Sequence, residues 1–219
     1  MQKEPTKHNY QRVLNETLKQ IAEDGKLPSL LLHACCAPCS SYVLEYLSKY
    51  FNITVFYYNP NIFPREEYEK RVAEIARLIE ELPTVHPVNL LLGNYDPERF
   101  FEMARGMEDL PEGGERCFAC YRLRLSLAAE EAKKGGFDYF TTTLSISPLK
   151  NAGKLNEIGR ELSDIYKVAY LYSDFKKRGG YQRSIELSRE FHLYRQDYCG
   201  CIYSKRKEDR EEIQKNSKE

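Results

Sequence analysis

The sequence predicts one α/β domain with a parallel sheet and helices on both of its faces, and three observations support this class. Short apolar runs alternate with segments of helical periodicity along most of the chain. No internal repeat or low-complexity linker divides it, and its 219 residues, of which 42% are hydrophobic, suffice for a single core. Strands that alternate with helices form parallel sheets, because each crossover helix returns the chain to the edge where the next strand begins.

Periodicity and helix-boundary signals place the expected elements. Pro64 and the acidic residues after it predict a helix start, Asp96 is the expected N-cap of a short helix, and two glycines end the helix that closes near residue 136. The expected strands are 29–35, 53–62, 85–95, 137–146 and 168–172, and the expected helices are 7–24, 39–50, 64–82, 96–106, 120–136, 152–166 and 180–196.

Charge and hydropathy narrow the class of protein. The 33 basic and 33 acidic residues cancel, so the whole chain has no net field that steers it toward nucleic acid. Residues 176–206 hold eight Lys or Arg against three Asp or Glu, which indicates either a solvated helical face or a local phosphate-binding patch. No apolar run reaches the length of about 18 residues typical of a membrane span, and the N-terminus is polar and amphipathic without a signal peptide. We therefore expect a cytoplasmic protein without a membrane partner.

The seven cysteines form three clusters: Cys35, Cys36 and Cys39 in HACCAPCS, Cys117 and Cys120 in RCFACYRLRL, and Cys199 and Cys201 in DYCGCIY. Thiols stay reduced in the cytoplasm, and buried structural cysteines need no clustering. The clusters therefore indicate metal binding or redox chemistry. The first cluster follows an expected strand, which predicts that it lies at the carboxyl edge of the sheet, where α/β proteins bind their ligands.

The C-x-x-C pair of Cys117 and Cys120 is either a thioredoxin-like redox pair or half of a metal site. It follows a Gly-rich loop in mid-chain rather than the first strand of a βαβ unit, which favours metal ligation. A tetrahedral site needs four ligands, and the first cluster can supply the other two in more than one combination, between which spacing does not choose. Four thiolates suit zinc or an iron–sulfur cluster. We favour the latter, because a chain with a full core has no need of a structural zinc.

The pair of Cys199 and Cys201 differs, since one glycine separates the two residues. A C-x-C sequence chelates one zinc with difficulty, whereas a glycine at its centre eases closure of a strained and therefore redox-active disulfide. The interpretation is a redox pair, with ligation of a second metal as the alternative. Asp197 is a candidate proton donor or metal ligand. His33 is expected to support the metal site by a hydrogen bond rather than as a ligand.

Taken in this order, HACCAPCS, RCFACYRLRL and DYCGC resemble the QueH-type epoxyqueuosine reductases, which do not use cobalamin. The segments YNPNIFPREEYEKR (58–71) and TTTLSISPLKN (141–151) look similar as well, and the resemblance spans roughly residues 29–204. It implies a Rossmann-like sheet of the HUP, or adenine nucleotide alpha-hydrolase, type. CCAPCSS stands in the place of the S-G-G-x-D-S phosphate loop of ATP-using relatives, so ATP hydrolysis is not expected.

The resemblance also implies the last step of queuosine synthesis in tRNA, in which the epoxycyclopentane on the wobble base of the anticodon is reduced to a cyclopentene. It implies a [4Fe-4S] cluster, to which our hypothesis assigns Cys35, Cys36, Cys117 and Cys120. We expect an N-terminal helical extension at 1–25, an α/β metal-binding catalytic domain at 26–204 and a charged tail at 205–219.

The remaining cysteines receive roles from the electron count of that reaction. Removal of the epoxide oxygen as water takes two electrons and two protons, and a dithiol carries both electrons. The hypothesis therefore has Cys199 and Cys201 cycle between dithiol and disulfide, with an electron donor that the sequence does not identify. Cys39 either replaces one cluster ligand or helps to hold a second, mononuclear metal ion that acts as a Lewis acid, with Asp197 as a further candidate ligand.

A tRNA partner predicts aromatic and basic side chains near the cysteines, because proteins read unstacked bases by stacking on aromatic or Arg side chains. The candidates for substrate binding are Tyr121, Arg122, Arg178, Tyr181 and Arg183. Arg122 and Arg124 lie two positions apart on an expected helix, so at most one of them faces the site.

Three other functions compete with this interpretation. An iron–sulfur tRNA-thiolating enzyme would activate the base with ATP, for which this chain lacks the phosphate loop. A zinc-stabilised RNA-binding module would contain zinc without iron or labile sulfide. A plain disulfide oxidoreductase would not need the five cysteines outside CGC.

Overall fold

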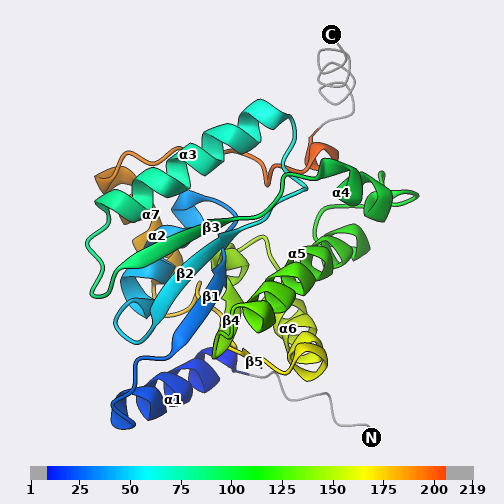
Figure 1. Ribbon diagram of the computed structural model, residues 1–219. Coiled ribbons are helices and arrows are strands. Elements are labelled where there is room, and N and C mark those ends of the chain that lie inside the picture. Colours follow the sequence, from blue (N-terminus) through cyan, green and yellow to red (C-terminus); the bar gives the residue numbers. More distant parts are fainter. Residues whose placement is uncertain (1–8, 206–219) are drawn as a thin grey trace, which may run out of the picture.

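A five-stranded sheet forms the centre of the computed structural model, which describes residues 9–205 (Figure 1). Every neighbouring pair of strands is parallel, and the order across the sheet is β3-β2-β1-β4-β5. The strands are β1 (Ser29–His33), β2 (Asn52–Tyr57), β3 (Val88–Leu92), β4 (Tyr139–Thr142) and β5 (Ala169–Tyr170). This is a Rossmann-like arrangement, and it confirms the predicted fold class.

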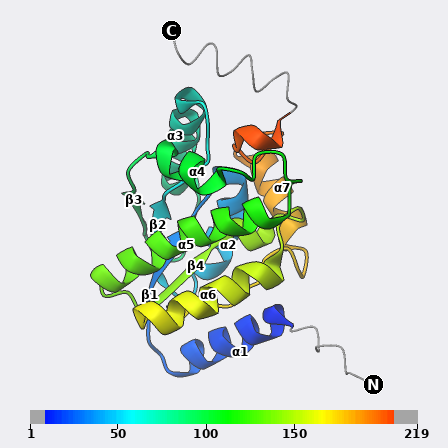
Figure 2. The same cartoon turned by 90° about the vertical axis from the view of Figure 1, so that its right-hand side faces the viewer.

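Helices cover both faces of this sheet. They are α1 (Tyr10–Glu23), α2 (Ala37–Leu47), α3 (Arg65–Glu81), α4 (Pro97–Ala104), α5 (Glu115–Lys134), α6 (Ala152–Tyr166) and α7 (Gly180–Glu190), with short 3-10 turns η1 (Thr143–Ile146) and η2 (Ile202–Ser204). Apolar side chains of α1, α2, α3 and α7 share one core cluster with the sheet, and those of α5 and α6 share another. Figure 2 shows α5 and α6 side by side across the second face.

The central strand β1 shows why the sheet is buried on both sides. Leu30 and Leu32 belong to the core under α1, α2 and α3, whereas Leu31 belongs to the core under α5 and α6. All three are fully buried. Successive side chains of a strand point to opposite faces, so a strand covered on both faces is apolar at every position rather than at alternate ones.

The two helices that carry cysteines begin earlier than the sequence predicts. Helix α2 begins at Ala37 rather than at residue 39, because Pro38 fits the first turn of a helix, where its missing N–H leaves no partner unsatisfied. Helix α5 begins at Glu115 rather than at residue 120, with Gly114 as the N-cap. As a result Cys36 is the N-cap of α2, and the pair near residues 117–120 lies in the first two turns of α5.

The strands are shorter than expected, because the chain turns out of the sheet at their carboxyl ends. After β2 the chain leaves the sheet at Asn59, whose side-chain amide donates to the carbonyl of Ala34 at 2.8 Å, and Pro60 cannot donate to a sheet ladder. After β4 the hydroxyl of Thr142 accepts from the backbone N–H of Leu144 at 3.1 Å and starts η1.

Expectations about helix ends, the N-terminal helix, the tail and membrane spans can also be compared with the structure. The last long helix ends at Glu190 rather than at residue 196, and Asp96 occupies the N-cap of α4 without a capping hydrogen bond from its side chain. Helix α1 packs Leu14, Leu18 and Ile21 into the same core as β1. Of the expected charged tail at 205–219, residues 206–219 lie outside the described part of the chain. None of the helices within residues 9–205 is long and apolar enough to cross a membrane.

Candidate metal and redox site

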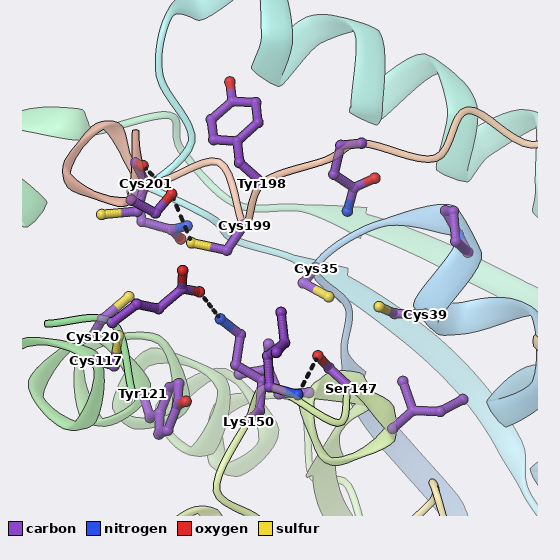
Figure 3. Close-up of a pocket in the computed structure, with 18 of the residues that line it drawn as sticks. Cys35, Cys39, Cys117, Cys120, Tyr121, Ser147, Lys150, Tyr198, Cys199 and Cys201 are labelled. Carbon is purple, nitrogen blue, oxygen red and sulfur yellow. Dashed lines mark hydrogen bonds and ion pairs between the residues drawn. The ribbon is translucent and has the colours of Figure 1, made fainter. Parts of the chain in front are cut away.

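A cavity of about 390 Å³ lies beyond the carboxyl ends of the strands, and six of the seven cysteines line it (Figure 3). They reach it from four places: the end of β1, the first turn of α2, the start of α5 and the segment after α7. All seven cysteines are free thiols. The six that line the cavity are Cys35, Cys39, Cys117, Cys120, Cys199 and Cys201.

The sulfur atoms of Cys35, Cys36 and Cys39 all lie within 4.8 Å of one another. Strand β1 ends at His33, and the turn into α2 lets the adjacent Cys35 and Cys36 bring their Sγ atoms to 3.7 Å. Cys39 joins them from the first turn of α2. Within residues 9–205 this is the one group of three or more Cys, His, Asp or Glu residues with ligand atoms so close, and it can bind a metal ion.

Hydrogen bonds among the three thiols of this group shift their pKa values in opposite directions. Hydrogen bonds from Cys36 and Cys39 lower the pKa of Cys35 well below its ordinary value. The contact with Cys35 raises the pKa of Cys36 to about 12 and also raises the pKa of Cys39. One thiolate therefore accepts hydrogen bonds from two thiols, and a metal ion can replace the two protons.

His33 fixes the strand end behind this group. Its ring is fully buried, with Nδ1 2.9 Å from the hydroxyl of Thr142 and Nε2 3.1 Å from the carbonyl oxygen of Tyr58. Burial, aided by the charge of Arg124, lowers the pKa of His33 to about 4, so the ring is neutral. A carbonyl only accepts, so Nε2–H donates to Tyr58 and Nδ1 accepts from Thr142. Both ring nitrogens thus bind the neighbouring strand ends.

The pair on α5 faces the first group across the cavity (Figure 3). The backbone N–H of Gly113 donates to the sulfur of Cys117 at 3.2 Å. Burial raises the pKa of Cys120. Neither sulfur belongs to the close group of Cys35. Of the four expected cluster ligands, Cys35, Cys117 and Cys120 line the cavity, and Cys36 does not line it but contacts Cys35.

The segment that holds Cys199 and Cys201 is fastened to the loop after β2. Gly200 has φ +94°, and its carbonyl accepts from the N–H of Phe63 at 3.0 Å. A Cβ atom on this glycine would lie 2.8 Å from Cγ1 of Ile62 and 3.0 Å from Nη1 of Arg71. Both the backbone conformation and the lack of space therefore require glycine between the two cysteines.

The two cysteines of this segment have pKa values shifted in opposite directions. A hydrogen bond from Cys201 and the positive charge of Lys150 lower the pKa of Cys199 to about 5, against the effect of burial. The same hydrogen bond and burial raise the pKa of Cys201. A thiolate beside a thiol is the arrangement from which a dithiol reacts as a nucleophile and closes to a disulfide.

Three further polar residues line the cavity, and only the structure shows what each of them contacts. Lys150 has a side chain that is 10% exposed, and its Nζ lies 3.2 Å from a carboxylate oxygen of Glu112. Arg124 is buried beside the cysteines, and Arg71 holds the Cys199 segment. The segments that contain these residues could be recognised in the sequence as similar to the family, but no local pattern distinguishes these side chains from surface charges.

The expected substrate-binding residues divide between the cavity and the surface. Tyr121 and Tyr181 line the cavity, as does Asp197. The hydroxyl of Tyr121 is buried without a hydrogen-bond partner among the described residues, and burial raises its pKa to about 12, so it is a free O–H donor. Arg122, Arg178 and Arg183 are not among the residues that line the cavity.

The surface arginines have partners of their own. Arg122 forms an ion pair with Glu161 on α6. Arg183 binds Glu45 at 2.6 Å and lies near two further acidic residues of α7. The structure thus places Arg124 rather than Arg122 toward the cavity, as their helical spacing requires.

A parallel Rossmann-like domain with three groups of thiols around one cavity at its sheet edge defines a class of α/β proteins whose clustered cysteines can bind a metal ion. Within this class the chain belongs to the QueH family, because the family model described as epoxyqueuosine reductase QueH matches residues 30–207. This match confirms the resemblance seen in the three cysteine motifs.

Curated relatives cover most of the chain. Epoxyqueuosine reductase QueH of Staphylococcus epidermidis is 42% identical over 206 residues, which are 92% of this chain and 87% of that protein. The protein of the same name from Streptococcus pyogenes serotype M1 is 43% identical and covers 90% of this chain and 78% of its own length. The one from Thermotoga maritima is 36% identical and covers 84% of this chain and 95% of its own.

Proposed function

We propose that this protein is an epoxyqueuosine reductase, which reduces the epoxide on the wobble base of a tRNA anticodon to the alkene of queuosine. The observation that carries the proposal is the convergence of six cysteines from distant segments on one cavity of about 390 Å³. Membership of the family, whose relatives carry this activity in their names, supports it. The reaction consumes two electrons and two protons and releases the oxygen as water.

The proposed ligands of a [4Fe-4S] cluster are Cys35, Cys36, Cys117 and Cys120. Their chemistry fits such a group, because all four are free thiols on the walls of one pocket or directly behind them, and thiolates are the ligands that iron–sulfur clusters prefer. Cys39, whose sulfur lies within 4.8 Å of two of them, is the alternative fourth ligand or a ligand of a second metal ion. When bound, the cluster supplies electrons one at a time.

Cys199 and Cys201 are the proposed two-electron carrier. Oxidation of this dithiol to a disulfide releases two electrons and two protons, which is the amount that the epoxide needs to become an alkene and water. The low pKa of Cys199 and the anchored Gly200 turn support this assignment. An external electron donor must then reduce the disulfide before the next turnover.

Polar groups of the cavity would handle the oxygen and its protons. Asp197 is the proposed proton donor, and the free hydroxyl of Tyr121 can donate a hydrogen bond to the substrate. Lys150 adds a positive charge on the same wall, where it stabilises negative charge that develops on the oxygen as a C–O bond breaks.

The tRNA would meet the cavity with its wobble base and the surrounding surface with its backbone. Tyr181 lines the cavity and can stack on a base. Arg178 lies just before α7 and Arg183 lies within it, both outside the cavity, and we assign both to phosphate contacts. Arg122 points to the surface between α5 and α6, so we assign it to backbone contacts rather than to the base.

The first experiment is iron and acid-labile sulfide analysis on protein purified without oxygen, followed by an assay with epoxide-bearing tRNA. About four iron and four sulfide per chain and formation of queuosine are expected. Zinc without sulfide would overturn the proposal in favour of an RNA-binding module. Sulfur transfer that depends on ATP would overturn it in favour of a thiolating enzyme.

A further inference from the structure

Arg124 lies on α5, one turn after Cys120, and its guanidinium is buried among the three cysteine clusters. The residue is 4% exposed and lines the cavity. Its Nε donates to the carbonyl of Cys120 and its Nη1 to the side-chain oxygen of Asn59, each at 3.3 Å. Both acceptors are neutral, so neither hydrogen bond balances the charge of the arginine.

No carboxylate within residues 9–205 lies within ion-pair distance of Arg124. The contrast with Arg71 is clear, since that equally buried side chain pairs with Glu67 at 2.7 Å. An arginine remains charged at any pH a protein encounters, and burial of an unpaired charge is strongly unfavourable. The charge of Arg124 therefore needs an anion inside the cavity.

The thiols that line the same cavity can supply this negative charge, whereas the carboxylates on its wall, those of Glu112 and Asp197, do not pair with Arg124. Burial lowers the pKa of Arg124, but Cys120, Cys35 and Cys199 together raise it above its ordinary value. These three residues come one from each cysteine cluster, so the guanidinium is electrostatically coupled to all three. The position of Arg124 thus matches a site where several thiolates gather negative charge.

We propose that Arg124 is the internal countercharge of the thiolate-bound metal centre. This inference rests on the proposed function and extends it to a residue that binds neither substrate nor metal. Four thiolates carry more negative charge than a [4Fe-4S] core balances, and each added electron increases the excess. A fixed positive charge in a buried site stabilises the more negative, reduced form, and so it raises the reduction potential of the centre.

The test compares three variants purified without oxygen: Arg124→Gln removes the charge, Arg124→Lys keeps it, and Arg122→Gln is the matched control. Arg122 lies on the same helix, two positions away and outside the cavity. The readout is the midpoint potential of the metal centre, followed by its absorption spectrum. We expect Arg124→Gln to make reduction about tenfold less favourable, which is about 59 mV for one electron. Arg124→Lys should recover most of the difference, and Arg122→Gln should leave the midpoint potential of the metal centre unchanged.

A second measurement covers the case in which Arg124→Gln does not retain its metal. Thermal unfolding is then compared without metal and with metal added back in excess to each variant. A countercharge predicts that Arg124→Gln destabilises the loaded protein but leaves the metal-free protein equally or more stable, because the unpaired charge is gone. A merely structural arginine would destabilise both forms alike, and that result would overturn the inference.

The outcomes separate this inference from the proposed function. If the unsubstituted protein contains no redox-active centre, the proposed function is refuted. Zinc affinity then tests the countercharge, which predicts that Arg124→Gln binds zinc more weakly than Arg124→Lys. An original protein with a redox-active centre whose potential is unchanged in Arg124→Gln refutes the countercharge alone.

Discussion

Arg71 donates through Nη1 to the carbonyl oxygen of Cys199 at 3.3 Å, although the two residues are 128 positions apart in the chain. Its Nη2 reaches the carbonyl of Tyr198 at 3.4 Å, and Glu67 on the same helix holds the guanidinium at 2.7 Å. A buried arginine of helix α3 therefore holds the backbone of the segment that contains the proposed redox pair.

Replacement of Arg71 by Met should loosen this segment. The change removes both carbonyl contacts and leaves the mostly buried carboxylate of Glu67 without its ion-pair partner, so we expect a loss of about 3–5 kcal/mol in the free energy of unfolding. Urea denaturation measures the loss, and the alkylation rate of Cys199 should rise at the same time. Arg65→Met is the control, because the exposed pair of Arg65 and Glu69 is worth less than about 1 kcal/mol. Equal effects of the two variants would contradict this account.

Replacement of Gly200 by Ala should strain the turn between the two cysteines. The new Cβ must occupy a backbone conformation with φ +94° and lie 2.8 Å from a side-chain atom of Ile62. We expect a destabilisation of about 2–3 kcal/mol, from backbone strain and steric overlap together. Gly25→Ala isolates the first contribution, since Gly25 also has positive φ but has nothing within 4 Å of a Cβ. Thermal unfolding of both variants measures the two contributions. An equal destabilisation by Gly25→Ala and Gly200→Ala would contradict a role for steric overlap at Gly200.

Substitution of a cysteine of the proposed redox pair and substitution of a proposed cluster ligand should have different effects on metal content. Cys199→Ser removes the thiolate of the proposed redox pair, and we expect turnover to fall at least about 100-fold while iron and sulfide remain. Cys117→Ser should lower iron content itself, because it removes a proposed ligand. Metal analysis and an epoxide-reduction assay on the same samples measure both effects. Retained turnover in Cys199→Ser would eliminate the dithiol mechanism.

Lys150 should affect the chemical step more than binding. Lys150→Met leaves the cavity walls in place but removes the ammonium near Cys199 and Tyr121, so we expect kcat to fall about 100-fold with little change in tRNA affinity. Lys154→Met is the control, because Lys154 lies outside the cavity and pairs with Glu157. A variant of Lys150 that bound tRNA poorly but reacted at the normal rate would assign this lysine to binding instead.

Binding of tRNA should weaken as salt rises, with unequal contributions from two neighbouring arginines. Arg178 has no carboxylate within ion-pair distance in the described part of the chain, whereas Arg183 is already paired with Glu45. Arg178→Ala should therefore reduce the slope of log affinity against log salt by about one, and Arg183→Ala by less. Titrations between about 50 and 200 mM salt measure the slopes. The opposite order would show that Glu45 releases Arg183 to the tRNA.

The fold and the chemical type of the site could be predicted from local patterns. The fully apolar run of β1 identifies a strand covered on both faces, and the alternation with helices implies parallel pairing, which the structure confirms. Element boundaries were less accurate, because the ends of α2 and α5 depend on a proline and a glycine that also fit the loops predicted there. The clustering of cysteines depends only on spacing along the chain, and the three motifs suffice to indicate the family, which the family model confirms.

Patterns that repeat or cluster over a few residues are therefore enough to predict the parallel α/β class and the three thiol motifs. The side chains that support those motifs depend instead on contacts between distant segments. Arg71 supports Cys199, Lys150 meets Glu112, and Arg124 rather than Arg122 turns toward the sulfurs. Such contacts join segments tens to more than a hundred positions apart, and they depend on how helices pack against the sheet. A local pattern limits the direction in which a side chain can point from its own helix. It contains no information about which residues of other segments that side chain contacts.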